Sequence, residues 1–326
     1  MCPHADDRRG RRSPSGVRIR AAGAVKLQIR PYSILPIRMH RLLTLAARLP
    51  LGFLQLFGAF VGELTFWLAP GYRRRTRENM RAAGYSDPRI YARAGRNAGR
   101  QAMESVWVWY RPVKEVLGRV DVEPAAERLI GEAMRSGRPV VFMTPHVGCF
   151  EVLPVWLAGT FFKETGRRIT ILYRPPRKEI LRAVVGEARQ APGIEAVPTT
   201  LAGVKHVIRS LRGGHTFGAL PDQVPSSGEG VWVDFFGRPA YTMTLPVRVA
   251  AQFDAVRIFA WGVRTKNGWR LDAECWDEPL TGDSAEDCRR MNAMIENIIR
   301  RMPEQYAWSY NRYKRPRGAP PLAQKA

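Results

Sequence analysis

Short apolar runs and helical stretches follow one another along the second half of the chain. Residues 139–143, Pro-Val-Val-Phe-Met, are continuously apolar, which is typical of a strand buried on both faces. Residues 169–173 and 216–220 are similar short runs, and residues 256–263 and 269–276 indicate a pair of strands. The pattern therefore predicts a sheet whose central strands are covered on both sides.

Segments with helical spacing lie between these strands. The first predicted helix begins at Pro124 and ends at Gly137, the second spans residues 201–212, and the stretch after Gly148 is also helical in pattern. A late helix is expected from Ser284, taken as its N-cap with Asp287 three residues on, to Pro303. Alternation of strands and helices predicts an α/β fold with a mostly parallel central sheet flanked by helices.

An apolar stretch near the N-terminus stands apart from this pattern. Residues 49–70 carry one charge, Glu63, and are long enough to cross a bilayer. Arginines flank the stretch on both sides, at Arg41 and Arg48 before it and at residues 73–75 after it, which fits contact with an anionic leaflet. We expect an N-terminal hydrophobic membrane helix, either spanning or lying in the interface, with a buried or partner-facing helix as the alternative.

The chain divides by composition into four parts. Residues 1–38 are predicted to be a disordered basic leader, residues 39–75 a membrane-associated hydrophobic helix region, residues 76–315 the catalytic domain, and residues 316–326 a flexible tail. The formal charge is 52 − 29 = +23, of which the leader holds nine basic residues against two Asp, or +7. The remaining +16 lies in the body, which implies an anionic partner: nucleic acid, anionic lipid or an acidic protein.

Several classes of site lack their signatures in this sequence. The four cysteines show neither CxxC nor Cys/His zinc spacing, no HExxH motif is present, and neither nucleotide-binding glycine fingerprint follows a strand. We therefore expect no metal and no cofactor. Four cysteines in a chain of this length do not form a disulfide scaffold, which favours a reducing, cytosolic-side location.

Two polar residues follow directly after predicted buried strands. His146 comes after the strand at 139–143, and Asp222 comes after the strand at 216–220. Ligands of open α/β sheets bind beyond the carboxyl ends of the strands, so both positions are candidates for a site. Glu151 lies five residues after His146, in the expected first helical turn. A carboxylate bonded to one imidazole nitrogen would raise the basicity of the other, as a general base acting on an alcohol requires. A buried histidine beside a helix-start glutamate is the structural alternative.

Cys149 and a group of arginines offer further chemistry near His146. Cys149 could form a nucleophilic Cys–His pair, although a small buried cysteine is the common case. Arg174, Arg177 and Arg189 follow the strand at 169–173. Guanidinium groups bind phosphate in bidentate fashion, so several of them would suit a phosphorylated lipid, a phosphopantetheine carrier or a developing oxyanion.

An ordered series of motifs resembles the late acyltransferases of lipid A biosynthesis, the lauroyl and myristoyl transferases of Gram-negative bacteria. The similarity runs from Arg41 to about Arg315. The matching segments are the apolar stretch with Tyr72-Arg-Arg-Arg-Thr-Arg-Glu-Asn79, Thr144-Pro-His-Val-Gly-Cys-Phe-Glu151 with the HxxxxE motif, Tyr173-Arg-Pro175, Arg189, Pro221-Asp-Gln223, Phe235-Phe-Gly-Arg-Pro-Ala-Tyr-Thr242, and Pro303-Glu-Gln-Tyr-Ala-Trp308 with Arg312 and Lys314.

The resemblance implies a role for each matched site residue. His146 would deprotonate the acceptor hydroxyl and Glu151 would orient it, while Arg189 and Asp222 match two further functionally important polar positions. Substrate-binding positions would be Arg174, Arg177, Gln223 and Arg238. The fold would be glycerolipid-acyltransferase-like.

The resemblance also implies the substrates and the location. The acyl donor would be the acidic acyl carrier protein, and the acceptor a 3-hydroxyacyl hydroxyl on anionic Kdo-lipid IVA. The enzyme would sit on the cytoplasmic face of the bacterial inner membrane.

Two alternatives remain open at the level of sequence. The same chemistry could act on a glycerol phosphate, an ornithine lipid or a glycosylated lipid. A non-enzymatic basic protein on nucleic acid or membrane is the other alternative, but its aromatics would be exposed for stacking. Trp107, Trp109 and Trp156 lie in apolar segments and are expected in the core, so we predict no nucleic acid partner.

Overall fold

The computed structural model describes residues 37–175, 191–225 and 228–322, with side chains from residue 40 onward. Its helices are α1 (Ile37–Ala47), α2 (Leu51–Leu68), α3 (Pro70–Ala82), α4 (Pro88–Tyr110), α5 (Val113–Leu117), α6 (Pro124–Arg135), α7 (Val152–Leu157), the π-helical turn η1 (Ala158–Phe162), α8 (Lys163–Thr165), α10 (Leu201–Arg212), α11 (Leu245–Gln252), α12 (Ser284–Arg301) and the 3-10 turn η2 (Pro303–Gln305). Its strands are β1 (Val120–Val122), β2 (Val140–Met143), β3 (Ile169–Tyr173), β4 (Ile194–Pro198), β5 (Thr216–Ala219), β6 (Gly230–Phe235), β7 (Arg238–Met243), β8 (Val256–Arg264) and β9 (Trp269–Cys275).

A seven-stranded sheet forms the centre of the fold. Its order is β1-β9-β8-β2-β5-β3-β4, and every neighbouring pair is parallel except β8 and β9. This confirms the predicted α/β fold with a mostly parallel sheet. Strands β6 and β7 form a separate antiparallel hairpin.

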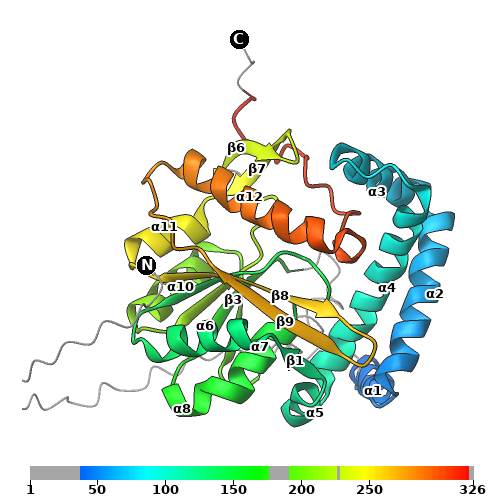
Figure 1. Cartoon of the computed structure of the whole chain (residues 1–326), viewed down its shortest axis with the longest axis horizontal. Coiled ribbons are helices and arrows are strands. Elements are labelled where there is room, and N and C mark those ends of the chain that lie inside the picture. The colour runs from blue at the N-terminus through cyan, green and yellow to red at the C-terminus, as the bar shows by residue number, and fades with distance from the viewer. Residues whose placement is uncertain (1–36, 176–190, 226–227, 323–326) are drawn as a thin grey trace, which may run out of the picture.

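Helices cover both faces of the sheet (Figure 1). The apolar side chains of β2 alternate between the two faces. Val140 and Phe142 pack in one core cluster with α6 and α7, and Val141 and Met143 pack in the other with α10, α11 and α12. A strand with a core on each face must be apolar at every position, which explains the continuous run in the sequence.

The predicted helices are found close to their expected bounds, but the cap of the last one differs. The side chain of Asp283, rather than that of Ser284, accepts the hydrogen bond at the N-terminus of α12, from the backbone N–H of Ala285 at 2.9 Å. Asp287 is engaged elsewhere, since its Oδ1 accepts from the backbone N–H of Thr281. Asp and Ser are both good N-cap residues, so the sequence alone did not separate two neighbouring candidates.

The apolar N-terminal stretch forms α2, which packs along α4 (Figure 1). Two glycines on each helix let the backbones touch: Gly58 and Gly62 of α2 face Gly95 and Gly99 of α4. A Cβ atom on Gly99 would lie 2.0 Å from the carbonyl oxygen of Gly58. Pairs of small residues spaced four apart permit this closeness because no side chain separates the helices.

The rest of the α2 surface is apolar and exposed. Phe53, Leu56, Phe60, Trp67 and Leu68 are each more than half exposed. Within the described residues, α2 is the one helix that is long and apolar enough to cross a membrane. Its carboxylate, Glu63, forms an ion pair with Arg96 of α4 at 3.1 Å, so the charge within the apolar stretch has a partner on the neighbouring helix.

The contact between α2 and α4 predicts how glycine substitutions affect stability. Gly99→Ala should lower the free energy of unfolding by roughly 1–3 kcal/mol, because the added methyl group meets backbone atoms that cannot give way. Gly52→Ala, on the same helix pair but facing open space, is the control and should change stability by less than about 1 kcal/mol. Thermal unfolding in detergent measures both. Equal stabilities for the two variants would show that the helices do not pack as described.

Candidate active site

The register of two strands sets the position of the candidate site. Strands β2 and β5 are parallel neighbours, and Met143 at the end of β2 lies opposite Ala219 at the end of β5. His146 and Asp222 each come three residues after these paired ends. Two residues at equal offsets from paired strand ends emerge side by side at the carboxyl edge of the sheet. The sequence predicted that both follow strand ends, and the structure adds that the two strands are neighbours.

His146 and Asp222 form two direct hydrogen bonds. The imidazole Nδ1 lies 2.7 Å from Asp222 Oδ1, and the backbone N–H of His146 donates to Asp222 Oδ2 at 2.9 Å. The side chain of Asp222 is 2% exposed and that of His146 is 14% exposed. The carboxylate is therefore shielded from water, while the imidazole remains partly accessible.

The surroundings of Asp222 keep it ionised. Burial by itself raises the pKa of Asp222, but the imidazole charge of His146, the two hydrogen bonds from His146 and the nearby guanidinium of Arg312 together lower it below its ordinary value. The hydroxyl of Tyr306 also hydrogen-bonds Asp222, and burial followed by the charge of Asp222 raises the pKa of Tyr306 well above its ordinary value. Tyr306 therefore stays protonated and donates to the carboxylate.

The guanidinium of Arg312 lies near Asp222 and is itself held by hydrogen bonds. Its guanidinium is buried and donates to the backbone oxygen of Tyr241 at 2.8 Å and to Thr242 Oγ1 at 2.6 Å. Sequence analysis placed Tyr306 and Arg312 in a matching segment but assigned neither a role. A buried arginine is rare and therefore suggests a special role. Asp222 lies 90 residues earlier in the chain, so only the fold shows that the two charges are close.

The hydrogen bonds also define the tautomer of His146. Since ionised Asp222 can only accept, Nδ1 carries the proton and Nε2 keeps its lone pair. The side-chain nitrogen of Gln223 lies 2.9 Å from Nε2 and is placed to donate to it. The basic nitrogen thus points away from Asp222, toward an amide that an incoming hydroxyl could replace.

The backbone around His146 is fixed by neighbouring segments. The N–H of Gly148 donates to the backbone oxygen of Gln305, and that of Cys149 to the oxygen of Gly262, both at 2.9 Å. Gly148 has a φ of +54°, and a Cβ there would lie 2.0 Å from the oxygen of Gly262. Only glycine fits this position, because the backbone of Gly262 approaches it so closely.

A comparison with known families assigns the chain to one of them. A model described as bacterial lipid A biosynthesis acyltransferase matches residues 35–315. The chain belongs to this acyltransferase family. This confirms the family expected from the ordered motifs.

Curated relatives of this family carry matching names. A lipid A biosynthesis acyltransferase of Haemophilus influenzae is 27% identical over 182 residues, and a lipid A biosynthesis myristoyltransferase of Escherichia coli is 25% identical over 185 residues. Each match covers 55% of this chain and 55% of the relative. The chain thus spans about half the length of the curated relatives it matches.

Glu151, the second residue of the HxxxxE motif, occupies a different place from the one expected. It is the N-cap residue of α7, is 6% exposed, and borders a cavity of about 50 Å³ together with Trp109 and Arg111. The orienting hydrogen bond to His146 Nδ1, which sequence analysis expected from Glu151, is made by Asp222. The strand register explains the difference, because it brings Asp222 directly beside the imidazole.

The predicted substrate-binding residues are found in separate places. Gln223 contacts His146 directly. Arg174 is exposed just after β3, and its charge lowers the pKa of Tyr310, whose hydroxyl accepts from the backbone N–H of Val224. Burial outweighs this effect and raises the pKa of Tyr310 overall. Arg174 therefore lies at the rim of the site.

The remaining predicted arginines are not at His146 or are outside the described range. Arg238 lies at the start of β7, where its guanidinium stacks on the ring of Tyr313, 3.9 Å from the ring centroid. Arg177 and Arg189 lie outside the described residues. Among the residues that the structure describes, no group of three or more His, Cys, Asp or Glu could hold a metal ion.

Cys149 is an unsuitable nucleophile in this protein. The residue is fully buried, and burial, followed by the charges of Glu104 and Glu151, raises the pKa of its thiol well above the ordinary value. The reactive form of cysteine is the thiolate, which is scarce at neutral pH under these conditions. The geometry therefore favours the histidine base over a Cys–His pair.

Asp222→Asn tests the double hydrogen bond to His146. Asp222 accepts from both the ring and the backbone of His146, whereas an asparagine offers one acceptor oxygen, so one of the two N–H groups must lose its partner or the ring must change tautomer. We expect a loss of roughly 1–3 kcal/mol in stability and a changed tautomer ratio, measured from the imidazole ¹⁵N shifts. Asp234→Asn, at an exposed position of β6, is the control. Unchanged ¹⁵N shifts in Asp222→Asn would contradict this geometry.

Cys149→Ala tests the alternative nucleophile. The variant should keep acyl-transfer activity within a few-fold of the parent, because the buried thiol makes no chemical contribution. Activity is compared after confirming the fold by circular dichroism. A folded but inactive Cys149→Ala would favour an acyl-cysteine intermediate.

Proposed function

We propose that this protein is an O-acyltransferase that moves a fatty acyl group from a thioester onto a lipid hydroxyl, with His146 as the general base. The observation that carries the proposal is the 2.7 Å contact between His146 Nδ1 and buried Asp222, which leaves Nε2 as the basic atom. Membership of the acyltransferase family supports the same reaction class.

The reaction follows from the tautomer of His146. The acceptor hydroxyl takes the place of the Gln223 amide at Nε2 and gives its proton to that nitrogen while its oxygen attacks the thioester carbonyl carbon. The imidazolium that forms is stabilised by Asp222, which remains ionised. Collapse of the tetrahedral intermediate breaks the carbon–sulfur bond, and the leaving thiolate takes the proton from Nε2.

The oxyanion that develops on the thioester carbonyl needs a hydrogen-bond donor other than the backbone N–H groups of residues 146–149. The backbone N–H groups of residues 146–149 all donate to protein oxygens, so the loop is rigid and these groups are occupied. Arg174, exposed just after β3, is our candidate for contact with the carbonyl oxygen or a substrate phosphate. Arg177 and Arg189 remain candidates for the same role. Glu151 remains a catalytic candidate as the partner residue of the HxxxxE motif.

The substrates are proposed from the family and from the charge. The donor is acyl carrier protein, whose acidic surface complements a body with a formal charge of +16. The acceptor is a 3-hydroxyacyl hydroxyl on Kdo-lipid IVA, in keeping with the lipid A pathway named for the relatives in Haemophilus influenzae and Escherichia coli. Its phosphate groups are anionic, which also suits a basic protein.

The location is proposed to be the cytoplasmic face of the bacterial inner membrane. The exposed apolar face of α2 and the arginines at Arg41, Arg48 and residues 73–75 support contact with an anionic leaflet. A lipid acceptor would then be reached without leaving the membrane surface.

An acyl-transfer assay tests the reaction and its acceptor. Purified protein is supplied with acyl carrier protein thioesters of several chain lengths, and Kdo-lipid IVA and glycerol 3-phosphate lipids are offered in parallel. We expect product only on Kdo-lipid IVA. His146→Ala should lower the rate by about 10³-fold, because the variant lacks the proposed general base. Glu151→Ala and Asp222→Asn should each remove most activity.

The outcomes separate the parts of the proposal. Product only on a glycerolipid would keep the mechanism and change the pathway, whereas near-normal turnover by folded His146→Ala would exclude the general base. Loss of activity in Asp222→Asn with normal turnover in Glu151→Ala would assign the orienting role to Asp222 alone.

A further inference from the structure

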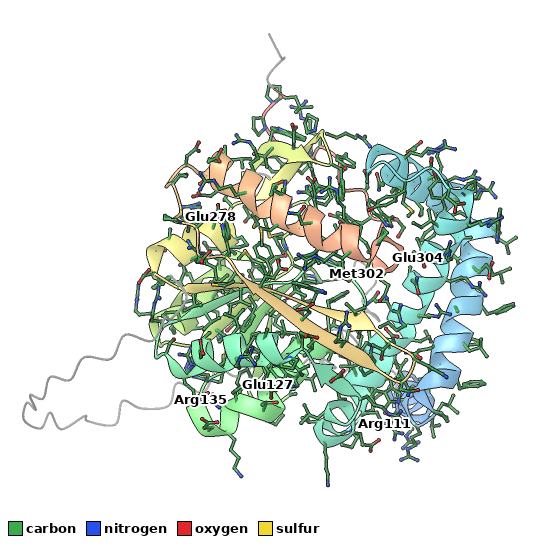
Figure 2. All side chains as sticks on the ribbon, viewed as in Figure 1. Arg111, Glu127, Arg135, Glu278, Met302 and Glu304 are labelled. Carbon is green, nitrogen blue, oxygen red and sulfur yellow. The ribbon has the colours of Figure 1, made fainter. Side chains whose placement is uncertain are left out.

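A second basic cavity lies apart from the His146 side chain, between the helical pair and the sheet. It has a volume of about 770 Å³ and is bordered by α2, α4, the end of β8 and the segment after α12. Met302 and Glu304 mark this segment in Figure 2, next to α4. We call this cavity the basic groove. Its charged residues are Arg100, Arg264, Lys266, Arg301 and Glu304.

Three of these charged residues are already paired. Arg264 forms an ion pair with fully buried Glu104 of α4, with Nη2 lying 2.8 Å from Oε2. Arg301 pairs with Glu274 at 2.5 Å, and Glu304 pairs with Arg93 at 2.7 Å. These three ion pairs lie along the border of the groove, and the paired residues contribute little net charge to it.

Two cations of the groove have no carboxylate partner. Arg100 donates to the amide oxygen of Asn97, and it makes no ion pair among the described residues. Burial, followed by the charges of Arg264 and Arg96, lowers the pKa of Arg100, and the charge of Glu104 opposes this shift only in part. Lys266 has neither a hydrogen bond nor an ion pair within the described part of the chain. The groove therefore carries two cations, Arg100 and Lys266, that form no ion pair among the described residues.

The groove also has an apolar border that continues onto α2. Gly52 and Leu56 line it, and Leu56 is 69% exposed on the same helix face as Phe53 and Phe60. A ligand in the groove can therefore place an anion against Arg100 and Lys266 while an attached hydrocarbon chain lies along α2. A small free anion would leave this apolar border unused.

We propose that the basic groove binds the phosphate group of a membrane amphiphile, held by Arg100 and Lys266 with its acyl chains along the exposed face of α2. Arg and Lys are the side chains that recognise phosphate, and juxtamembrane clusters of them attract anionic lipids. This site is distinct from the His146 centre and does not depend on acyl transfer. It sets the orientation of the protein on the bilayer, because it fixes a lipid head group beside α2.

Vesicle binding by a double variant tests the proposal. Full-length Arg100→Gln/Lys266→Gln is compared with the parent on vesicles of phosphatidylcholine with and without phosphatidylglycerol. We expect the dissociation constant for phosphatidylglycerol vesicles to rise by about 25-fold, from roughly fivefold for each of the two cations removed. Binding to pure phosphatidylcholine should change little.

A matched control removes the same charge elsewhere. Lys163→Gln/Arg212→Gln changes exposed residues on α8 and α10, across the molecule from α2 (Figure 1). It should weaken binding by no more than about twofold, because charges beyond a Debye length are screened. Equal weakening by the two double variants, or no weakening by the groove variant, would overturn the proposal. Lys266→Gln alone, at an exposed position, repeats the test if Arg100→Gln disturbs folding.

A further measurement distinguishes the two sources of phosphate. Acyl transfer is assayed in uncharged detergent micelles that contain the acceptor but no phospholipid. If the groove instead held the acceptor's own phosphate, the groove variant would raise the KM for the acceptor with kcat unchanged, and this would overturn a site separate from the His146 centre. If it holds a bystander phospholipid, KM in micelles should stay the same while vesicle binding falls. The vesicle experiment does not require acyl-transfer activity. If the proposed enzymatic function is wrong, the groove variant should still bind phosphatidylglycerol vesicles more weakly, so the two proposals can fail independently.

Discussion

The parallel pairing of β2 with β5 is the constraint on which the candidate site depends. Met143 and Ala219 end their strands opposite one another, so the residues three positions beyond them, His146 and Asp222, are brought into contact. A shift of the register by one residue would move the carboxylate along the sheet edge and break both hydrogen bonds. The apolar cores on the two faces of β2 hold that register, which connects packing to chemistry.

The C-terminal segment supplies further contacts to His146 and Asp222. Backbone bonds join Gly148 to Gln305 and His146 to Ala307, while Tyr306 and Arg312 surround Asp222 beneath the imidazole. A buried carboxylate is costly unless its oxygens are hydrogen-bonded and a positive charge is near. Tyr306, Arg312 and the N–H groups of His146 supply these conditions, so the site is rigid before a substrate arrives.

The N-terminal helices are attached to the same body by two different kinds of contact. Glycine pairs bring the backbones of α2 and α4 together, and the buried pair of Arg264 and Glu104 joins α4 to the end of β8. The exposed apolar face of α2 therefore has a fixed orientation relative to the sheet edge that carries His146. If the exposed face of α2 lies against a bilayer, as proposed, this coupling determines where the candidate site faces.

The sequence by itself determined the α/β class, the apolar helix and the positions of His146 and Asp222 at strand ends, because buried strands and amphipathic helices have distinct periodicities. It assigned the carboxylate that orients the imidazole to Glu151. Glu151 was favoured by its proximity along the chain, whereas the tertiary structure placed Asp222 there through strand pairing. The roles of Tyr306 and Arg312 and the basic groove also appeared only in the fold. The physical reason is that these sites join residues far apart in the chain, and only packing of the sheet, helices and C-terminal segment decides which of them meet.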